Sequence, residues 1–165
     1  MCIRDRSLGV DPEAALAAME GYEAVGMRLR AQDLPGGVRA LNDAYNANPA
    51  SMAASLQLLA SLPGRRVAVL GDMLELGPDE ARSHRDVAVL AHQLALDAVV
   101  LVGPRMAGAV EACPGALAFV DPDDAVAPMR QLLRSGDRVL FKGSRGARVE
   151  RVLQGLEAPV KGEES

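Results

Sequence analysis

Short apolar runs alternate along the chain with longer segments whose apolar residues recur at helical spacing. Three of the runs are almost wholly apolar, which is typical of strands buried on both faces of a parallel sheet: 66–70, 98–102 and 138–142. Further strands are expected at 27–32, 38–44 and 117–120. The sequence Leu34-Pro35-Gly36-Gly37 predicts a tight turn between the first two of these.

The segments between the strands carry helical patterns with recognisable starts. Asp11-Pro12 and Asn48-Pro49 each place a capping side chain before a proline at the first helical position. The pattern predicts helices at 11–20, from Pro49 through Leu62, and at 79–95, 105–112, 122–134 and 146–156. Successive strand-to-helix units imply right-handed crossovers. The predicted fold is therefore an α/β, Rossmann-like, doubly wound and mostly parallel sheet with helices on both faces.

Composition narrows the possible partners of such a domain. The 165 residues carry 18 basic and 22 acidic side chains, a formal net charge of −4, which argues against a nucleic-acid groove. No apolar run approaches the roughly 18 to 20 residues that span a bilayer, and the N-terminus lacks the apolar core of a signal peptide. We therefore expect a cytoplasmic protein that binds neither nucleic acid nor membrane. Its two cysteines, Cys2 and Cys113, form no disulfide framework.

Ligands of doubly wound sheets bind beyond the carboxyl ends of the strands, so the residues that follow each strand are candidate site residues. Asp43 ends one predicted strand, and Asn46 and Asn48 lie between it and a helix N-terminus. A carboxylate can accept both hydroxyls of a ribose, and helix N-terminal amides suit phosphate oxygens. The alternative is a capped helix with no ligand. Arg28, before this segment, fits either a binding role or a solvated surface position.

A second candidate cluster follows the last predicted strand, at Lys142-Gly143-Ser144-Arg145. The chain has only two lysines against 16 arginines, so a lysine at a strand end suggests a compact charge for a phosphate or carboxylate. Gly143 allows close approach of a ligand to the backbone. The alternative is that Lys142 neutralises a nearby aspartate. Two further polar strand ends occur at 71–77 and 102–105.

Several familiar motifs are absent from the sequence. Neither His84, expected to be a hydrogen-bonded structural residue, nor the surface residue His92 belongs to a metal-binding pattern or a nucleophile triad. The phosphate-loop pattern G-x-x-x-x-G-K-[ST] is missing, and no G-x-G-x-x-G follows a strand. A nucleotide site in this chain would therefore be a partial one.

Four stretches together resemble the C-terminal domain of the Mur ligases of bacterial peptidoglycan synthesis. They are GMR at 26–28, NDAYNANPASM at 42–52, VAVLGDMLELG at 67–77 with His84 beyond it, and GDRVLFKGSR at 136–145. The resemblance covers about residues 9–156. The branch that adds diaminopimelate or lysine carries a DNPR-type loop and a KGHE-type ending, whereas this chain has Val102-Gly103-Pro104-Arg105 and Lys142-Gly143-Ser144-Arg145. This favours the branch that adds a dipeptide.

The resemblance implies a three-domain, ATP-dependent amide ligase. Its substrates would be UDP-N-acetylmuramoyl-tripeptide and D-alanyl-D-alanine, and an acyl phosphate would be the intermediate. By this resemblance Arg28, Asp43 and Asn46 would bind the nucleotide. Lys142 would be catalytic, and Gly143, Ser144 and Arg145 would bind substrate. ATP and Mg²⁺ would act in the complete enzyme, with the Mg²⁺ ligands outside this chain.

The resemblance also implies a division of the chain. Residues 1–24 would carry a helix left over from the central ATPase domain, 25–157 would form the C-terminal domain, and 158–165 a frayed tail. The N-terminal and central domains, with the phosphate loop, would be missing, so we expect this fragment alone to be inactive. Two rival hypotheses are another ligase of the superfamily, such as a folylpolyglutamate synthase, and a non-catalytic α/β binding module.

Overall fold

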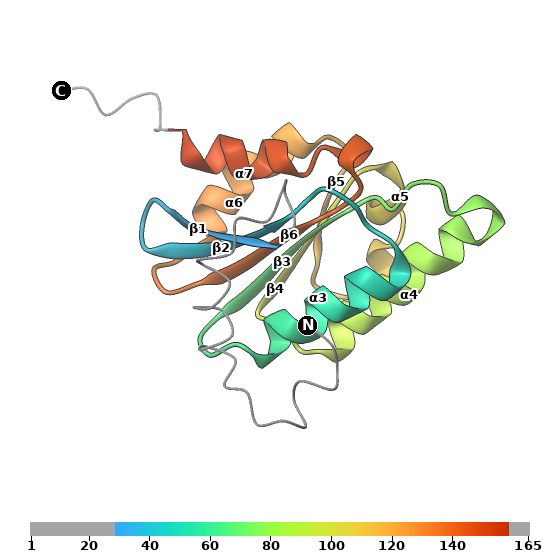
Figure 1. Cartoon of the computed structure of the whole chain (residues 1–165), viewed down its shortest axis with the longest axis horizontal. Coiled ribbons are helices and arrows are strands. Elements are labelled where there is room, and N and C mark those ends of the chain that lie inside the picture. Colours follow the sequence, from blue (N-terminus) through green and yellow to red (C-terminus); the bar gives the residue numbers. More distant parts are fainter. Residues whose placement is uncertain (1–28, 159–165) are drawn as a thin grey trace.

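The fold is a six-stranded, mostly parallel sheet between two layers of helices, as seen in the computed structural model of the chain, which describes residues 29–158 (Figure 1). The strand order is β1-β2-β6-β3-β4-β5. Only β1 and β2 pair antiparallel, while every other neighbouring pair is parallel. The predicted doubly wound α/β architecture is confirmed.

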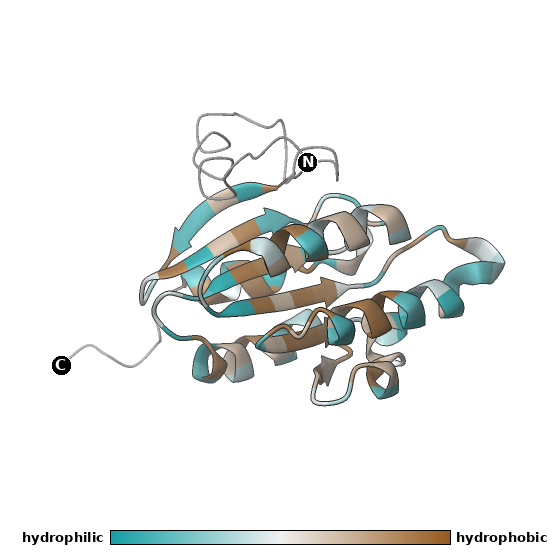
Figure 2. Ribbon diagram, turned by 90° about the horizontal axis from the view of Figure 1, so that it is seen from below, coloured by the Kyte–Doolittle hydropathy of each residue, from teal (hydrophilic) through white to brown (hydrophobic). Residues whose placement is uncertain are grey.

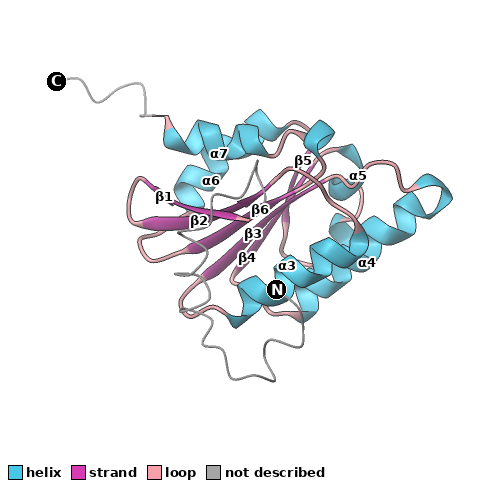
Figure 3. Cartoon of the chain, in the orientation of Figure 1, coloured by secondary structure: helices cyan, strands magenta, loops and turns pink. Residues whose placement is uncertain are grey.

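The strands lie close to their predicted positions. They are β1 (Arg30–Leu34), β2 (Val38–Asp43), β3 (Arg66–Gly71), β4 (Ala98–Val102), β5 (Leu117–Phe119) and β6 (Arg138–Lys142). The α-helices are α3 (Pro49–Ser61), α4 (Glu80–Gln93), α5 (Pro104–Ala107), α6 (Val126–Leu132) and α7 (Glu150–Glu157). Short 3₁₀ turns precede α4, α6 and α7, and another follows α5. Figure 3 shows the helices on either side of the strands.

Each face of the sheet has its own hydrophobic core. Helices α3, α4 and α5 cover one face, and residues such as Leu41, Leu56 and Leu140 pack there. Helices α6 and α7 cover the other face, where Val139, Phe141 and Leu153 are buried. The apolar colouring of the strands continues into the inward sides of the helices in Figure 2. Because side chains of a strand alternate between faces, each strand residue belongs to one core only.

Local sequence signals explain where several elements begin. Asn48 and Ser51 form the two halves of a capping box at the start of α3, with Pro49 at the first helical position. The turn between β1 and β2 needs two residues with positive φ, and Gly36 and Gly37 supply them at 80° and 76°. The predicted cap and turn are therefore present.

Three predicted helices are shorter than the sequence pattern suggested. The helix expected at 105–112 ends at Ala107, where Gly108 and a 3₁₀ turn interrupt it. The helix expected at 122–134 starts as a 3₁₀ turn and becomes α6 only at Val126. The one expected at 146–156 starts at Glu150, because Arg148 adopts a left-handed conformation that a helix cannot contain.

Three other predictions fall outside the part of the chain that the structure describes. They are the helix at 11–20, the position of Arg28, and the frayed tail beyond residue 158. Within residues 29–158, no helix is both long and apolar enough to cross a lipid bilayer.

Candidate functional site

The carboxyl ends of β2, β6, β3 and β4 meet at one edge of the sheet, and the polar side chains predicted there lie at that edge. Asp43 and Lys142 are the last residues of β2 and β6, and they are direct partners in the parallel register of these two strands. Their side chains point to the face covered by α3, since Leu41 and Leu140, two residues earlier, pack in that core. Two charged residues that are 99 positions apart are thereby brought together.

Lys142 and Asp43 form a buried ion pair. The Lys142 Nζ donates to Asp43 Oδ2 at 2.6 Å and to the carbonyl oxygen of Asn46 at 3.2 Å. The Ser55 hydroxyl, from the inner side of α3, donates to the same Asp43 oxygen at 2.9 Å. The side chain of Lys142 is 2% exposed and that of Asp43 is 14% exposed. The alternative interpretation of Lys142, neutralisation of a nearby aspartate, is therefore realised in the structure.

The ion pair nevertheless leaves groups that can bind a ligand. Both contacts that Asp43 makes with the described residues use Oδ2, so its Oδ1 accepts no hydrogen bond from them. An ammonium group has three N–H donors, and Lys142 makes two contacts with the residues that the structure describes, so one N–H has no partner among them. Asn46 is exposed at the mouth of this cluster, between the end of β2 and the start of α3.

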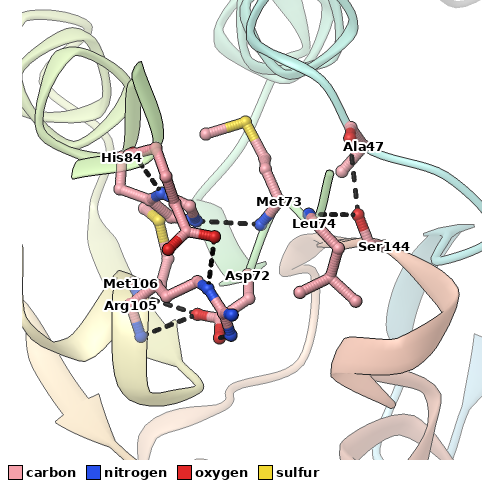
Figure 4. A network of polar contacts seen from close by, with 9 residues as sticks. Ala47, Asp72, Met73, Leu74, His84, Arg105, Met106 and Ser144 are labelled. Atoms are coloured by element: carbon pink, nitrogen blue, oxygen red, sulfur yellow. Dashed lines mark hydrogen bonds and ion pairs between the residues drawn. The ribbon is translucent and has the colours of Figure 1, made fainter. Parts of the chain in front are cut away.

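Gly143, Ser144 and Arg145 continue directly from Lys142, but only Arg145 faces solvent. The Ser144 hydroxyl accepts from the Leu74 backbone N–H at 2.9 Å and donates to the Ala47 carbonyl at 3.4 Å (Figure 4). A Cβ at Gly143 would lie 2.8 Å from a methyl group of Val149 and 3.1 Å from the Cα of Gly71, so no larger residue fits. Gly143 and Ser144 thus tie three strand-end loops together, and Arg145 is exposed above them.

A second polar network lies at the ends of β3 and β4, around Asp72. Its Oδ1 accepts from the backbone N–H groups of Arg105 and Met106, at 3.1 and 2.8 Å, and so caps α5 from the loop after β3 (Figure 4). The Arg105 guanidinium approaches Asp72 Oδ2 at 3.4 Å and donates to Glu80 at 2.6 Å. These contacts raise the pKa of Arg105, the bond to Glu80 contributing most.

Gly103 allows this close packing. Its φ of 100° favours glycine, and a Cβ there would lie 2.5 Å from Asp72 Oδ1. Asp72 itself is almost fully buried, with a side-chain exposure of 3%. The polar strand ends at 71–77 and 102–105 are thus joined through one carboxylate, that of Asp72.

His84 has the structural role that its helix position suggested. Its Nε2 accepts from the Met73 backbone N–H at 2.9 Å, and Nδ1 lies 2.7 Å from the Glu80 carbonyl oxygen. Since a backbone N–H must donate, Nε2 is unprotonated and Nδ1 carries the proton. The imidazole thereby fixes the start of the loop after β3 to helix α4. His92 is exposed, as expected.

A shallow depression of about 440 Å³ lies beside this second network. Arg105 and Glu80 border it on one side, and its remaining lining comes from Ala81, Arg85, Gly108, Ala109, Glu111 and Ala112. None of the predicted site residues takes part in it. Apart from Arg28, which lies outside the described residues, the predicted site residues instead lie at or just after the ends of β2 and β6.

Two observations concern reactive and metal-binding groups. Among residues 29–158, no group of three or more His, Cys, Asp or Glu side chains could hold a metal ion. Cys113 is buried, and burial raises the pKa of its thiol, so it lacks the character of a nucleophile.

The sequence analysis missed Ser55 and did not connect Asp72 with Arg105. Ser55 is one helical turn from Met52 and Leu59 on the buried side of α3, so a polar residue on an apolar helix face was the available signal. Arg105 follows the strand neighbouring Asp72, but only the strand order β3-β4 shows that the two loops are adjacent.

Comparisons with known proteins agree with this geometry. A family model described as the Mur ligase, glutamate ligase domain, matches residues 27–145. The UDP-N-acetylmuramoyl-tripeptide--D-alanyl-D-alanine ligase of Bacillus subtilis is 35% identical over 164 residues, covering 92% of this chain and 35% of that protein. Its namesake in Escherichia coli is 34% identical over 153 residues, covering 92% and 34%.

Solved structures show the same relation. The MurF ligase of Thermotoga maritima, crystallised with ADP, superposes with a TM-score of 0.73 at 30% identity, over 92% of this chain and 35% of that one. MurF of Acinetobacter baumannii gives 0.76 at 30% identity, over 93% and 35%. A folylpolyglutamate synthase/dihydrofolate synthase of Yersinia pestis shares the fold, with 0.58 at 18% identity, over 82% and 32%.

The chain spans about a third of the length of the curated relatives it matches. Within that third, the family match covers β1 to β6 and all the strand ends that carry the polar clusters. The chain therefore belongs to the Mur ligase family, of which it carries the glutamate ligase domain.

Proposed function

We propose that this chain is the C-terminal domain of an ATP-dependent amide ligase that adds D-alanyl-D-alanine to UDP-N-acetylmuramoyl-tripeptide. The observation that carries the proposal is the 35% identity to a ligase of that name over 92% of the chain. The Asp43, Lys142 and Asn46 cluster supports it, because the cluster lies at the sheet edge where doubly wound folds bind ligands. The enzyme would act in the cytoplasm.

The proposed reaction has two steps. The terminal carboxylate of the tripeptide attacks the γ-phosphorus of ATP, which gives an acyl phosphate and ADP. The amine of D-alanyl-D-alanine then attacks the acyl carbon, loses a proton and expels inorganic phosphate, so an amide forms. Neither step needs a covalent bond to the protein, so the contribution of this domain is to position groups and stabilise charge.

The two ends of the Asp43 and Lys142 pair would serve different parts of this reaction. The free Oδ1 of Asp43 is suited to accept from ribose hydroxyls, with Asn46 beside it. The remaining N–H of Lys142 would stabilise negative charge on the acyl phosphate or the tetrahedral intermediate. Arg28 would contact the nucleotide phosphates. Gly143 and Ser144 would shape the wall next to the substrate, and Arg145 would contact it.

Other domains would supply the rest of the site. The chain's sequence has no phosphate loop, and its described residues offer no metal site, so the phosphate loop and the Mg²⁺ ligands would come from a central domain. ATP use is supported by the ADP complex of the Thermotoga maritima relative. Under this proposal residues 1–24 belong with the central domain and residues 25–157 form the closing domain.

Two alternative functions predict different substrates or a different role for the ion pair. A folylpolyglutamate synthase would add glutamate to a folate, and the likeness to such an enzyme, at 18% identity, extends to the fold alone. A non-catalytic binding module would need no ion pair at the ends of β2 and β6 for turnover. The KGSR and NANP segments and the identity to the dipeptide-adding ligases favour our proposal over both.

The test joins this chain to the N-terminal and central domains of the Thermotoga maritima relative. We expect phosphate release that requires both UDP-N-acetylmuramoyl-tripeptide and D-alanyl-D-alanine, and none with folate and glutamate. The control is the relative's own C-terminal domain, joined in the same way. An active control beside an inactive test protein would contradict the proposal. The isolated chain should form no product and bind ATP with a Kd weaker than roughly 1 mM.

A further inference from the structure

The loop after β3 is held rigidly at its base. The backbone N–H of Met73 donates to His84 of α4, and that of Leu74, the next residue, donates to Ser144 after β6. Asp72, just before them, is fixed by three contacts with the start of α5. Figure 4 shows these three anchors converging on one short stretch of backbone from different elements. The residue that follows is therefore presented from a fixed position.

That residue is Glu75, and its conformation is unusual. Its φ of 64° lies in the left-handed region, which favours glycine and disfavours side chains with a Cβ. The side chain is exposed and has no partner among the described residues. Gly77, two residues later, also has a positive φ, of 62°. A strained, exposed glutamate on an anchored loop points to a functional use of its carboxylate.

An unpaired positive charge lies on the adjoining loop. Leu74 and Ser144 are hydrogen-bonded, and a Cβ at Gly146 would lie 2.6 Å from the Leu74 side chain, so Leu74, the residue before Glu75, lies against the segment 144–146 that contains Arg145. Arg145 is exposed, and none of the described residues pairs with its side chain. Opposite charges thus stand free on two neighbouring loops at the ligand-binding edge of the sheet.

We infer that Glu75 and Arg145 form a cradle for a small zwitterion, in which Glu75 binds an ammonium group and Arg145 binds a carboxylate. The assignment of Arg145 to substrate and of D-alanyl-D-alanine as the zwitterion rests on the proposed function. Glu75 is the addition: it selects and orients the amino end of the dipeptide. A dipeptide spans roughly 7 Å, which two side chains on adjacent loops can bridge.

The charge of Glu75 distinguishes this place from a phosphate site. A carboxylate repels phosphate oxygens, whereas an ammonium forms a charge-assisted hydrogen bond with it. The Lys142 and Asp43 cluster, at the ends of β6 and β2, is the better place for anionic groups. The loops after β3 and β6 would then have separate roles. Glu75 would hold the ammonium group near the acyl phosphate, and that group would give up one proton, to the Glu75 carboxylate or to water, before the resulting amine attacks the acyl carbon.

The direct test is a titration of the isotope-labelled full chain with D-alanyl-D-alanine, followed by NMR. We expect shifts of the amides at 74–76 and 144–146. N-acetyl-D-alanyl-D-alanine, which lacks the ammonium, and D-alanyl-D-alaninamide, which lacks the carboxylate, should each bind about tenfold more weakly, the ratio expected for one charge-assisted contact. No shift at roughly 10 mM dipeptide would overturn the inference.

Substitutions of Glu75 and Arg145 test which of the two binds the ammonium group and which binds the carboxylate of the dipeptide. In Glu75→Gln the preference for the dipeptide over its N-acetyl form should vanish, and in Arg145→Gln the preference over the amide should vanish. Glu75→Gly relieves the positive φ while removing the carboxylate, so it should unfold at the same or a higher Tm and still lose the preference. The matched controls are Asp79→Asn, in the 3₁₀ turn just before α4, and Arg85→Gln on α4, both exposed.

The joined enzyme described above separates this inference from the proposed function. If it ligates and Glu75→Gln raises the KM for the dipeptide about tenfold with the KM for ATP unchanged, both stand. If it ligates and Glu75→Gln leaves the dipeptide KM unchanged, only the inference is wrong. If the control with the relative's own C-terminal domain ligates and the joined enzyme does not, while the isolated chain still binds the dipeptide through Glu75, only the proposed function is wrong.

Discussion

Two aspartates end neighbouring regions of the same sheet edge and have opposite surroundings. Asp72, after β3, is 3% exposed, and both of its carboxylate oxygens accept contacts from the α5 region. Asp43, at the end of β2, is 14% exposed and uses one oxygen for both of its contacts. Asp72 therefore uses both carboxylate oxygens in contacts within residues 29–158, whereas Asp43 keeps one oxygen without a partner among them.

The contrast indicates how a structural carboxylate can be told from one that is proposed to bind a ligand when both lie at strand ends. Position in the fold does not separate them, because doubly wound sheets place loops of both kinds at this edge. The number of unsatisfied acceptors separates them. A buried polar group without a partner is costly, so a free oxygen on a partly exposed carboxylate is tolerated where water or a ligand reaches it.

The largest expected effect comes from Asp72. Asp72→Ala leaves two backbone N–H groups at the start of α5 without an acceptor, and should lower the free energy of unfolding by about 3 kcal/mol or more. Asp72→Asn keeps one acceptor oxygen and should cost less. Urea denaturation measures both. A loss below about 1 kcal/mol for Asp72→Ala would show that the carboxylate is not structural.

The Asp43 and Lys142 pair should respond asymmetrically. Asp43→Ala strands a cation that is 2% exposed and should cost about 3 kcal/mol, whereas Lys142→Met leaves a carboxylate that water can reach and should cost about 1 kcal/mol. The double variant should be more stable than Asp43→Ala alone. A double-mutant cycle in urea measures the coupling, and simple additivity would contradict the ion pair.

A smaller loss is expected where the anchors of the loop after β3 are removed. His84→Leu leaves the Met73 N–H without its acceptor and should cost about 2 kcal/mol, while Ser144→Ala frees the Leu74 N–H and should cost about 1 kcal/mol. His92→Leu, on the exposed side of the same helix, is the control. Thermal unfolding reports the order, and equal effects of the two histidines would refute the structural role of His84.

The smallest effect is expected for a third aspartate, Asp97, which lies just before β4, at the opposite ends of the strands from Asp43 and Asp72. The Arg66 backbone N–H donates to Asp97 and, with the Arg66 side chain, holds the pKa of Asp97 below its ordinary value of 3.8. A carboxyl group whose pKa is lower in the folded state than in the unfolded chain stabilises the fold at pH values above the unfolded-state pKa. This contribution is lost as the pH falls below about 4 and through the folded-state pKa.

Asp97 is exposed, so its contribution should be less than about 1 kcal/mol. Asp97→Asn should lower stability slightly at pH 7 and match the wild type near pH 2. Chemical denaturation at these two pH values tests this, and a difference that grows on acidification would contradict it.

The strands and their parallel arrangement could be predicted because buried strands leave continuous apolar runs, such as Arg66 to Leu70. Helix lengths were less predictable, since apolar spacing continues across Gly108 and Arg148, where the backbone breaks the helix. The spacing of apolar residues shows which side of a segment is buried, but it does not show where the backbone hydrogen bonds of a helix end.

The site could be predicted in part for a similar reason. The strand-end positions of Asp43 and Lys142 marked each of them separately as a candidate. Their pairing depends on β6 lying beside β2, and the sequence does not show this strand order because the two residues are 99 positions apart. Ser55, which contacts Asp43, and Arg105, which contacts Asp72, lie on other elements, and only the packing of those elements brings them to the aspartates. Whether Gly143 and Ser144 serve a ligand stays a prediction, and their polar contacts lie within the protein.

The direct register partnership of Asp43 and Lys142 has a consequence for folding. A slip of one residue between β2 and β6 would turn one of the two side chains to the opposite face, leaving a cation against the apolar core around Phe141. Pairing of strands so distant in the chain is a late and slow event. A misaligned pairing of β2 and β6 would be destabilised, so the ion pair proposed to take part in the reaction would also favour the native register of the sheet.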